Sequence, residues 1–239
     1  MRKLIMAGVA AAGMVLGIAT AQAAPTISLT GGALLNDTAN DFANWLGGSG
    51  SSALLWEGGT ISISDATFVR IQYFGKEASF DNHEFWWGTL GPYGTGTKIA
   101  STGPGQPNTV PLPIPALPFF PLSTTLISGV TSGKLPFYFG ITAPEAAPPA
   151  VPRIVENGHV DPGNTDDNAF YFGRNADGSL RTSGTSVWVL LDDGGGGRDN
   201  DHDDMLILLT AEIPEPSTYL LLLAGLGLLG FMARRRMQG

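Results

Sequence analysis

The sequence predicts an all-β protein whose main domain is an antiparallel β-sandwich or jelly roll. Several segments alternate between apolar and polar residues, which is the pattern of strands that bury one face. No amphipathic helix longer than about three turns is evident. The 239 residues include 33 glycines and 17 prolines, residue types that favour turns. Many short strands joined by such turns are typical of sandwiches and jelly rolls.

Seven segments are predicted strands. Residues 60–64 alternate strictly, and residues 66–74 alternate over most of their length. The other five predicted strands are residues 79–87, 135–142, 168–172, 186–191 and 205–211. A short helix is predicted for residues 36–46.

A proline-rich stretch interrupts the strand pattern. Residues 103–121 contain seven prolines, and each proline removes a donor that a central strand needs. We therefore expect a long surface loop with polyproline character, and the same for residues 143–152. A docking motif for a proline-binding partner is the alternative interpretation.

The first 23 residues have the pattern of a secretory signal peptide. Arg2 and Lys3 precede an uncharged apolar run over residues 4–20, and Ala21-Gln22-Ala23 has the form of a cleavage site. We expect cleavage after Ala23. An uncleaved N-terminal anchor is the alternative.

The remaining chain is strongly acidic. Residues 24–213 hold 8 of the 13 basic residues and 20 of the 21 acidic ones, a formal net charge of −12. Such a surface repels phosphate backbones and anionic headgroups, which excludes nucleic acid as a partner. The sequence has no cysteine, so stability comes from packing, hydrogen bonds or a bound metal. We expect one β-sandwich domain over residues 24–212.

An acidic hairpin near the end of this domain is the candidate metal site. Six aspartates fall within 13 residues, between two apolar strands and around four glycines. Carboxylates so close together repel unless a cation or water separates them. Their oxygens are ligands of the type that Ca²⁺ prefers, although the flanking strands and the later positions exclude an EF-hand. The candidate Ca²⁺ ligands are Asp192, Asp193, Asp199, Asp201, Asp203 and Asp204. A solvated acidic turn is the alternative.

Aromatic residues suggest a second kind of site. Trp86 and Trp87 are candidate glycan contacts, because aromatic rings stack on sugar rings. Neighbours in a strand point to opposite faces, so at most one of the two belongs to the core. The alternative is that neither ring is free for a ligand, one being packed in the core and the other covered by the proline-rich loop. We predict no catalytic residues, since none of the three histidines lies in a metal-hydrolase spacing.

The C-terminal segment, residues 213–239, combines three features. It begins with the residues Pro214, Glu215, Pro216 and Ser217. An uncharged apolar run of 15 residues follows at 219–233, and three arginines come after it at 234–236. The run predicts one transmembrane helix, and the arginines predict that its C-terminal end lies on the cytoplasmic side. The helix is shorter than the roughly 20 residues that a permanent membrane span needs. This segment resembles a PEP-CTERM sorting signal. The resemblance implies that an exosortase, a membrane transpeptidase of Gram-negative bacteria, cleaves the tail, within an export system linked to exopolysaccharide and biofilm.

The acidic hairpin carries a second resemblance. This part of the chain is similar to the pattern of a domain family of unknown function, the DUF4114-like group. The similarity runs from the aliphatic strand through Asp192-Asp193 and the glycines to Asp199, Asp201, Asp204 and Met205. His202 and Asp203 depart from that pattern. The resemblance implies a β-sandwich with a Ca²⁺-linked hairpin and no enzymatic activity.

Together these features predict an exported, non-catalytic protein of the cell surface or biofilm matrix, processed by an exosortase and holding a structural Ca²⁺ ion. It would pass the inner membrane, stay anchored there transiently by its C-terminal helix, and then reach the cell surface or the medium. The alternative is an extracellular polysaccharide-binding module or polysaccharide-active enzyme, with exopolysaccharide as the partner.

Overall fold

The computed structural model describes residues 24–37, 53–65, 67–76, 82–88, 96–102, 120–142, 153–159, 167–192, 202, 204–213, 225–230, 232 and 234. The chain divides into two units. One unit runs from Pro25 to Ile213 and holds all the described strands. The other unit consists of Met1–Ala24 and Pro214–Gly239.

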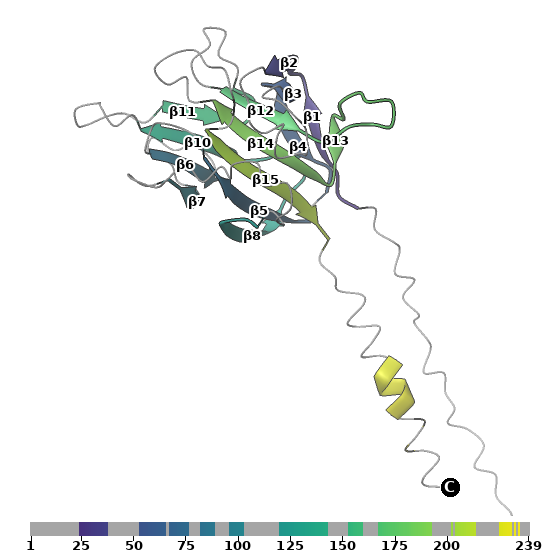
Figure 1. The fold of residues 1–239 in the computed structure, drawn as a ribbon. Coiled ribbons are helices and arrows are strands. Elements are labelled where there is room, and N and C mark those ends of the chain that lie inside the picture. The colour runs from purple at the N-terminus through teal and green to yellow at the C-terminus, as the bar shows by residue number, and fades with distance from the viewer. Residues whose placement is uncertain are drawn as a thin grey trace, which may run out of the picture. The chain divides into compact units, whose positions relative to one another are not determined.

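The strand-bearing unit is built from three sheets, all of them antiparallel (Figure 1). The largest has seven strands in the order β2-β3-β12-β14-β15-β5-β8, and the other two have the orders β13-β1-β4-β9 and β11-β10-β6-β7. The strands are β1 (Ile27–Thr30), β2 (Ala33–Asp37), β3 (Ala53–Glu57), β4 (Thr60–Ile63), β5 (Thr67–Gly75), β6 (Asn82–Trp87), β7 (Thr97–Ser101), β8 (Ser123–Val130), β9 (Gly133–Lys134), β10 (Phe137–Thr142), β11 (Arg153–Glu156), β12 (Asp167–Tyr171), β13 (Ser183–Gly184), β14 (Ser186–Asp192) and β15 (Met205–Glu212).

The predicted all-β sandwich class is confirmed, and each of the seven predicted strands overlaps an observed one. The predicted helix at residues 36–46 is wrong at its start. Asn36 and Asp37 belong to β2, where they pair with Leu54 and Ala53 of β3. The rest of that segment lies outside the described residues. So do residues 103–119 of the predicted proline-rich loop, the second predicted loop at residues 143–152, and the whole predicted signal peptide, residues 1–23.

The main core lies between two layers. The seven-stranded sheet forms one layer and the two four-stranded sheets together form the other, because buried side chains from all three sheets belong to one apolar cluster. In β15 the core side chains are Ile207, Leu209 and Ala211, whereas Leu206 and Leu208 point to the opposite face. This is the alternation that a pleated strand imposes.

The opposite face of the seven-stranded sheet also buries apolar side chains. Its cluster contains Leu55, Phe74, Ala169, Leu190 and Leu206, with Tyr171, Trp188 and Leu208 packed against them. The rings of Phe74 and Trp188 lie 4.8 Å apart between centroids. Strands β14 and β15 are therefore apolar on both faces, which explains why their sequences read as continuous hydrophobic runs.

Two glycine corners carry the chain between the layers. The chain crosses from β1 to β2 at Gly31-Gly32 and returns from β3 to β4 at Gly58-Gly59. Gly59 has a φ of +87°, and a Cβ atom added there would lie 2.9 Å from the backbone nitrogen of Gly32. Only glycine combines that backbone conformation with so close an approach.

Asn157 joins the two four-stranded sheets. It follows β11 and is fully buried. Its Oδ1 accepts from the Ile61 nitrogen at 2.8 Å, and its Nδ2 donates to the carbonyl oxygens of Ile61 at 2.7 Å and Leu135 at 2.8 Å. One side chain thus pairs with three buried backbone groups, of which the Ile61 carbonyl oxygen also accepts from the Leu135 nitrogen at 3.0 Å.

Residues 225–230, 232 and 234 are helical. Within the described part of the chain, no helix combines the length and apolar character needed to cross a membrane. The span at residues 219–233 stays a prediction.

Replacing Asn157 by alanine should destabilise the sandwich. Asn157→Ala removes three buried hydrogen bonds and takes the side-chain partner from the Ile61 nitrogen and the Leu135 carbonyl oxygen, so we expect a loss of roughly 3 kcal/mol in the free energy of unfolding. Urea denaturation of residues 24–213 measures it. Asn175→Ala is the matched control, since Asn175 is exposed and its Nδ2 donates only to Ser179 Oγ within a turn. Equal losses in the two variants would contradict the role assigned to Asn157.

Candidate functional site

The acidic hairpin begins where two central strands end. Strands β14 and β15 are antiparallel neighbours, with Leu191 opposite Met205. Asp192 follows Leu191 and Asp204 precedes Met205, and the backbone nitrogen of Asp204 donates to the carbonyl oxygen of Leu191 at 3.1 Å. The two aspartates therefore lie across from each other at the base of the hairpin.

Both aspartates are nearly buried, at 3% exposure for Asp192 and 8% for Asp204. His202, two residues before Asp204, is fully buried and has a φ of 39°. Burial of a carboxylate is unfavourable unless partners compensate for the lost hydration. All three residues take part in polar or electrostatic interactions, and all three are nearly or fully buried.

Two further charged residues reach the same end of the sheet, and sequence reasoning missed both. Asp167 begins β12 and pairs with Asp192 in the backbone register. Lys76 follows β5, whose last residue Gly75 lies opposite Leu206, and it is 1% exposed. Residues of the adjacent strands β12, β14, β15 and β5 thus gather charges at one end of the sheet (Figure 1).

Sequence signals for these residues existed but were ambiguous. Asp167 belongs to a run with Asp166 and Asn168 immediately before an aromatic strand segment, and Lys76 is a charge directly after a long apolar strand. Both patterns are also common at ordinary strand ends. Only the pairing of β12 with β14 and of β5 with β15 brings them to the hairpin.

The predicted Ca²⁺ ligands divide into two groups. Asp192 and Asp204 are placed by the structure as stated above, and the remaining four lie outside the described residues: Asp193, Asp199, Asp201 and Asp203. Among the residues that the structure does describe, no group of three or more histidine, aspartate or glutamate side chains is arranged to hold a metal ion. Ca²⁺ binding stays a prediction.

Trp86 and Trp87 point to opposite faces of their sheet, as the alternation in β6 predicts. Trp87 belongs to the main core, with 9% exposure. Trp86 lies on the outer face and is half-buried. Of the two predicted glycan contacts, only Trp86 is placed where a ligand can reach it.

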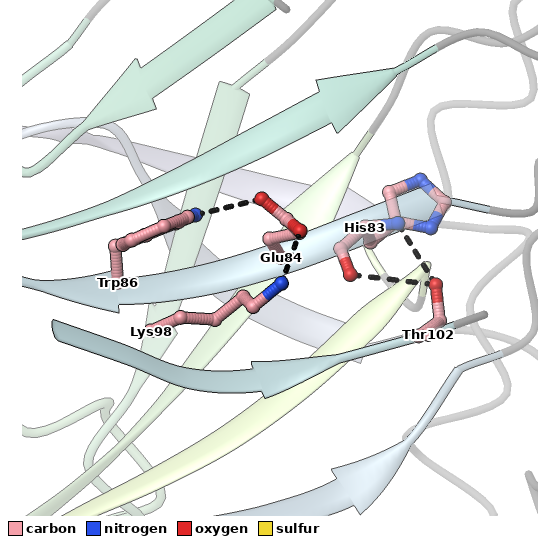
Figure 2. A network of polar contacts seen from close by, with 5 residues as sticks. All are labelled: His83, Glu84, Trp86, Lys98 and Thr102. Carbon is pink, nitrogen blue, oxygen red and sulfur yellow. Dashed lines mark hydrogen bonds and ion pairs between the residues drawn. The ribbon is translucent and has the colours of Figure 1, made fainter. Parts of the chain in front are cut away.

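Trp86 is held by charged neighbours (Figure 2). Its Nε1 donates to Glu84 Oε2 at 3.0 Å, and Lys98 Nζ donates to Glu84 Oε1 at 2.9 Å. The same ammonium lies 5.7 Å from the centroid of the Trp86 ring. Glu84 therefore connects the indole to the cation that lies over it, a combination of ion pair and cation–π contact.

The other side of Trp86 is occupied by Tyr138. The two rings are nearly parallel, with centroids 6.0 Å apart and an angle of 5° between planes. Tyr138 comes from β10 and Lys98 from β7, which flank β6 on opposite sides. Trp86 thus has a neighbour on each ring face and presents its edge to the solvent.

Tyr138 is chemically constrained by this arrangement. Its hydroxyl group is buried and has no hydrogen-bond partner in the described part of the chain. Burial, and secondarily the Glu84 carboxylate, raises the pKa of Tyr138 above its ordinary value. The raised pKa keeps the Tyr138 hydroxyl group protonated near pH 7, and its ring packs against Trp86.

His83, at the start of β6, holds the end of the β6–β7 pair. Figure 2 shows that its backbone nitrogen donates to Thr102 Oγ1 at 2.8 Å and that this hydroxyl lies 3.4 Å from the His83 carbonyl oxygen. The backbone nitrogen of Thr102 also donates to the His83 carbonyl oxygen, at 2.8 Å. His83 is fully buried. These contacts are structural.

The last strand leads directly into the C-terminal segment. Glu212 ends β15 and forms an ion pair with Arg70 of β5. Ile213 follows with 37% exposure. The predicted sorting residues Pro214, Glu215, Pro216 and Ser217 lie outside the described residues.

Comparison with known proteins identifies this C-terminal segment. Residues 212–236 match the family model of the PEP-CTERM protein-sorting motif. No curated protein and no solved structure matches the chain. The match confirms the sorting signal predicted at residues 213–239, and the chain therefore carries a PEP-CTERM protein-sorting motif that begins at the last residue of its final strand.

Proposed function

We propose that this chain is an exported, non-catalytic protein of the cell surface or biofilm matrix, released from a membrane-anchored intermediate when an exosortase removes its C-terminal tail. The observation that carries the proposal is the sorting motif at residues 212–236. A sorting motif needs a cargo that is complete without it. The compact unit that ends at Ile213 is such a cargo.

The position of the motif supports removal of the tail without damage to the fold. Strand β15 is a central strand, paired with β14 on one side and β5 on the other. Its pairing with β5 is complete at Glu212 opposite Phe68. A cut after this point removes none of the described strands, so the sandwich keeps its core and its hydrogen-bonded ladder.

The non-catalytic part of the proposal is supported by the burial of two of the three histidines, since the third, His159, is partly exposed. A general acid or base has to come within hydrogen-bond reach of its substrate. His83 and His202 are fully buried. The backbone nitrogen of His83 donates to Thr102 Oγ1 at the end of the β6–β7 pair. These histidines fit structural roles.

We also propose a structural Ca²⁺ ion in the acidic hairpin, as the resemblance to the DUF4114-like group implies. Asp192 and Asp204 support it, because they lie across from each other at the hairpin base and are nearly buried. Lys76 offers a competing way to balance their charge, since it lies at the same end of the sheet. A divalent cation and a buried ammonium differ in one respect that can be measured: only the cation can be removed with a chelator.

The second candidate function, binding of an extracellular polysaccharide, is favoured by one observation. Trp86 is half-buried on an outer sheet face beside the carboxylate of Glu84, and carboxylates accept hydrogen bonds from sugar hydroxyl groups. Against it, Lys98 and Tyr138 lie on the two faces of the ring. A sugar could stack on Trp86 only after Lys98 moved aside.

Removal of the Pro-Glu-Pro sequence should block processing. In a Gram-negative host with an exosortase, we expect the chain with Pro214, Glu215 and Pro216 changed to alanine to stay full-length in the membrane fraction, whereas the unaltered chain is shortened and released. Intact mass spectrometry and cell fractionation measure both properties.

Gln238→Ala is the control for that experiment, because it alters the tail beyond the matched residues 212–236. Deletion of the exosortase should make the unaltered chain behave like the triple variant. Release of the triple variant at the normal rate would refute the sorting role of these residues.

Ca²⁺ should raise the melting temperature of chelator-stripped residues 24–213. At ten times the dissociation constant, binding to the folded state stabilises it by about 1.4 kcal/mol, or roughly 3–6 °C for a domain of this size. Asp192→Asn should abolish the Ca²⁺-dependent rise. Glu156→Gln, which removes one exposed carboxylate from β11, should keep it. An unchanged melting temperature at millimolar Ca²⁺ would leave Lys76 and hydrogen bonds as the stabilising partners.

A further inference from the structure

The edges of the three sheets differ in how they are protected. An edge strand exposes unpaired backbone groups and can add a strand from another molecule. Proteins prevent this with charged side chains, prolines or very short edge strands. In the described part of the chain, the six edge strands are β2 and β8, β7 and β11, and β9 and β13.

Five of the six edges carry such protection. Strand β2 contains Asp37, β7 contains Lys98, and β11 contains Arg153 and Glu156. Strands β9 and β13 have only two residues each.

Strand β8 is the exception in charge and length, although its register with β5 shifts between the pairs Thr67–Val130 and Val69–Ile127 and Gly129 has a φ of +68°. It has eight residues, Ser-Thr-Thr-Leu-Ile-Ser-Gly-Val, with no charge and no proline. On one side it pairs with β5, with Leu126 opposite Arg70 and Thr124 opposite Gln72. Among the described strands none pairs with its other side.

Apolar side chains lie exposed along this edge. Leu126 is 54% exposed on the outer face, and Phe120 and Leu122 are exposed in the residues that lead into β8. Ile127, on the alternate face, packs against the main core. The strand is therefore held in place by the core while one backbone edge and its outer apolar side chains face the solvent.

The charge of the domain decides what can occupy this edge. With 8 basic and 20 acidic residues between positions 24 and 213, two copies of the domain repel each other over most of their surfaces. Strand β8 carries no charged side chain. Pairing of two copies of β8 therefore brings no like charges together and costs the least electrostatic energy. Antiparallel pairing of a strand with its own copy is symmetric under a two-fold axis, which is the commonest symmetry of homodimers.

We propose that two copies of this protein associate by antiparallel pairing of their β8 strands. Leu126 lies opposite Leu126 of the second copy at the two-fold axis, with Thr124 opposite Ser128 and Thr125 opposite Ile127 of that copy. This register buries the exposed leucines against each other and places no charged residue across the new ladder. The two seven-stranded sheets become one continuous sheet.

Disulfide trapping tests the pairing directly, because the chain contains no cysteine of its own. Directly opposed residues of antiparallel strands have Cα atoms about 4.5–5.5 Å apart, within the range of a disulfide. The full chain with Leu126→Cys, exported to an oxidising periplasm, should form a covalent dimer that reductant separates on a gel.

Two single-cysteine variants serve as matched controls. Leu34→Cys places a thiol at a comparably exposed leucine, 60% exposed, on the protected edge β2. Thr124→Cys lies on β8 itself but is separated from its own copy by more than about 10 Å in the proposed register. We expect roughly tenfold more covalent dimer with Leu126→Cys than with either control.

A charge variant tests the same pairing without a cross-link. In the full chain purified in detergent micelles, Leu126→Lys sets two like charges opposite each other at the axis, so light scattering should show loss of the dimer. Leu34→Lys makes the same substitution on β2 and should leave the dimer intact.

The proposal is overturned by several outcomes. One is that the unaltered chain is monomeric. Another is that the Leu126→Cys and Leu34→Cys variants cross-link equally. A third is that the Thr124→Cys variant cross-links and the Leu126→Cys variant does not. The proposal would also be overturned if the Leu126→Cys variant formed a disulfide with a different protein. That result would show that the other protein adds a strand to β8. Unchanged circular dichroism of each variant shows that the fold is retained and makes these outcomes decisive.

Discussion

The structure depends on the burial of β14 and β15 on both faces. On one face they contribute Val187, Val189, Ile207 and Leu209 to the main core, and on the other Leu190 and Leu206 belong to the second cluster. Their position at the centre of the seven-stranded sheet fixes both ends of the pair. One end places Asp192 and Asp204 side by side, and the other leads from Glu212 into the sorting motif. The same packing thus positions the candidate metal site and the exit of the tail.

Charge organises the rest of the surface. Lys76 is buried at the acidic end of the large sheet, and Lys98 is paired with Glu84 beside Trp86. The ion pair of Lys98 offsets one carboxylate of a strongly acidic domain. On the sheet edges, charged residues discourage pairing everywhere except at β8 and at strands of two residues. The pattern is consistent with a protein that stays soluble through repulsion and associates through one uncharged strand.

Sequence periodicity predicted the strands that bury a complete face. Residues 60–64 and 66–74 alternate because β4 and β5 each present one side to the core, and the same rule separated Trp86 from Trp87. It missed β8 and β11, among others. The sequence of β8 mixes small polar and apolar residues, and Arg153 to Glu156 is too short to show a period. These segments become strands because neighbouring strands satisfy their backbone groups, a cause that local sequence does not contain.

The amino-acid sequence by itself determined the sorting motif and the all-β class. A sorting motif is recognised as a linear stretch of residues, and strand alternation is a local property, so both are visible without a fold. The tertiary structure alone decided that Asp167 and Lys76 join the acidic hairpin, that Asn157 joins two sheets, and that β8 is an unprotected edge. The physical reason is that strand pairing brings together residues many positions apart, and the choice of pairing follows from burial of the whole core rather than from any one segment.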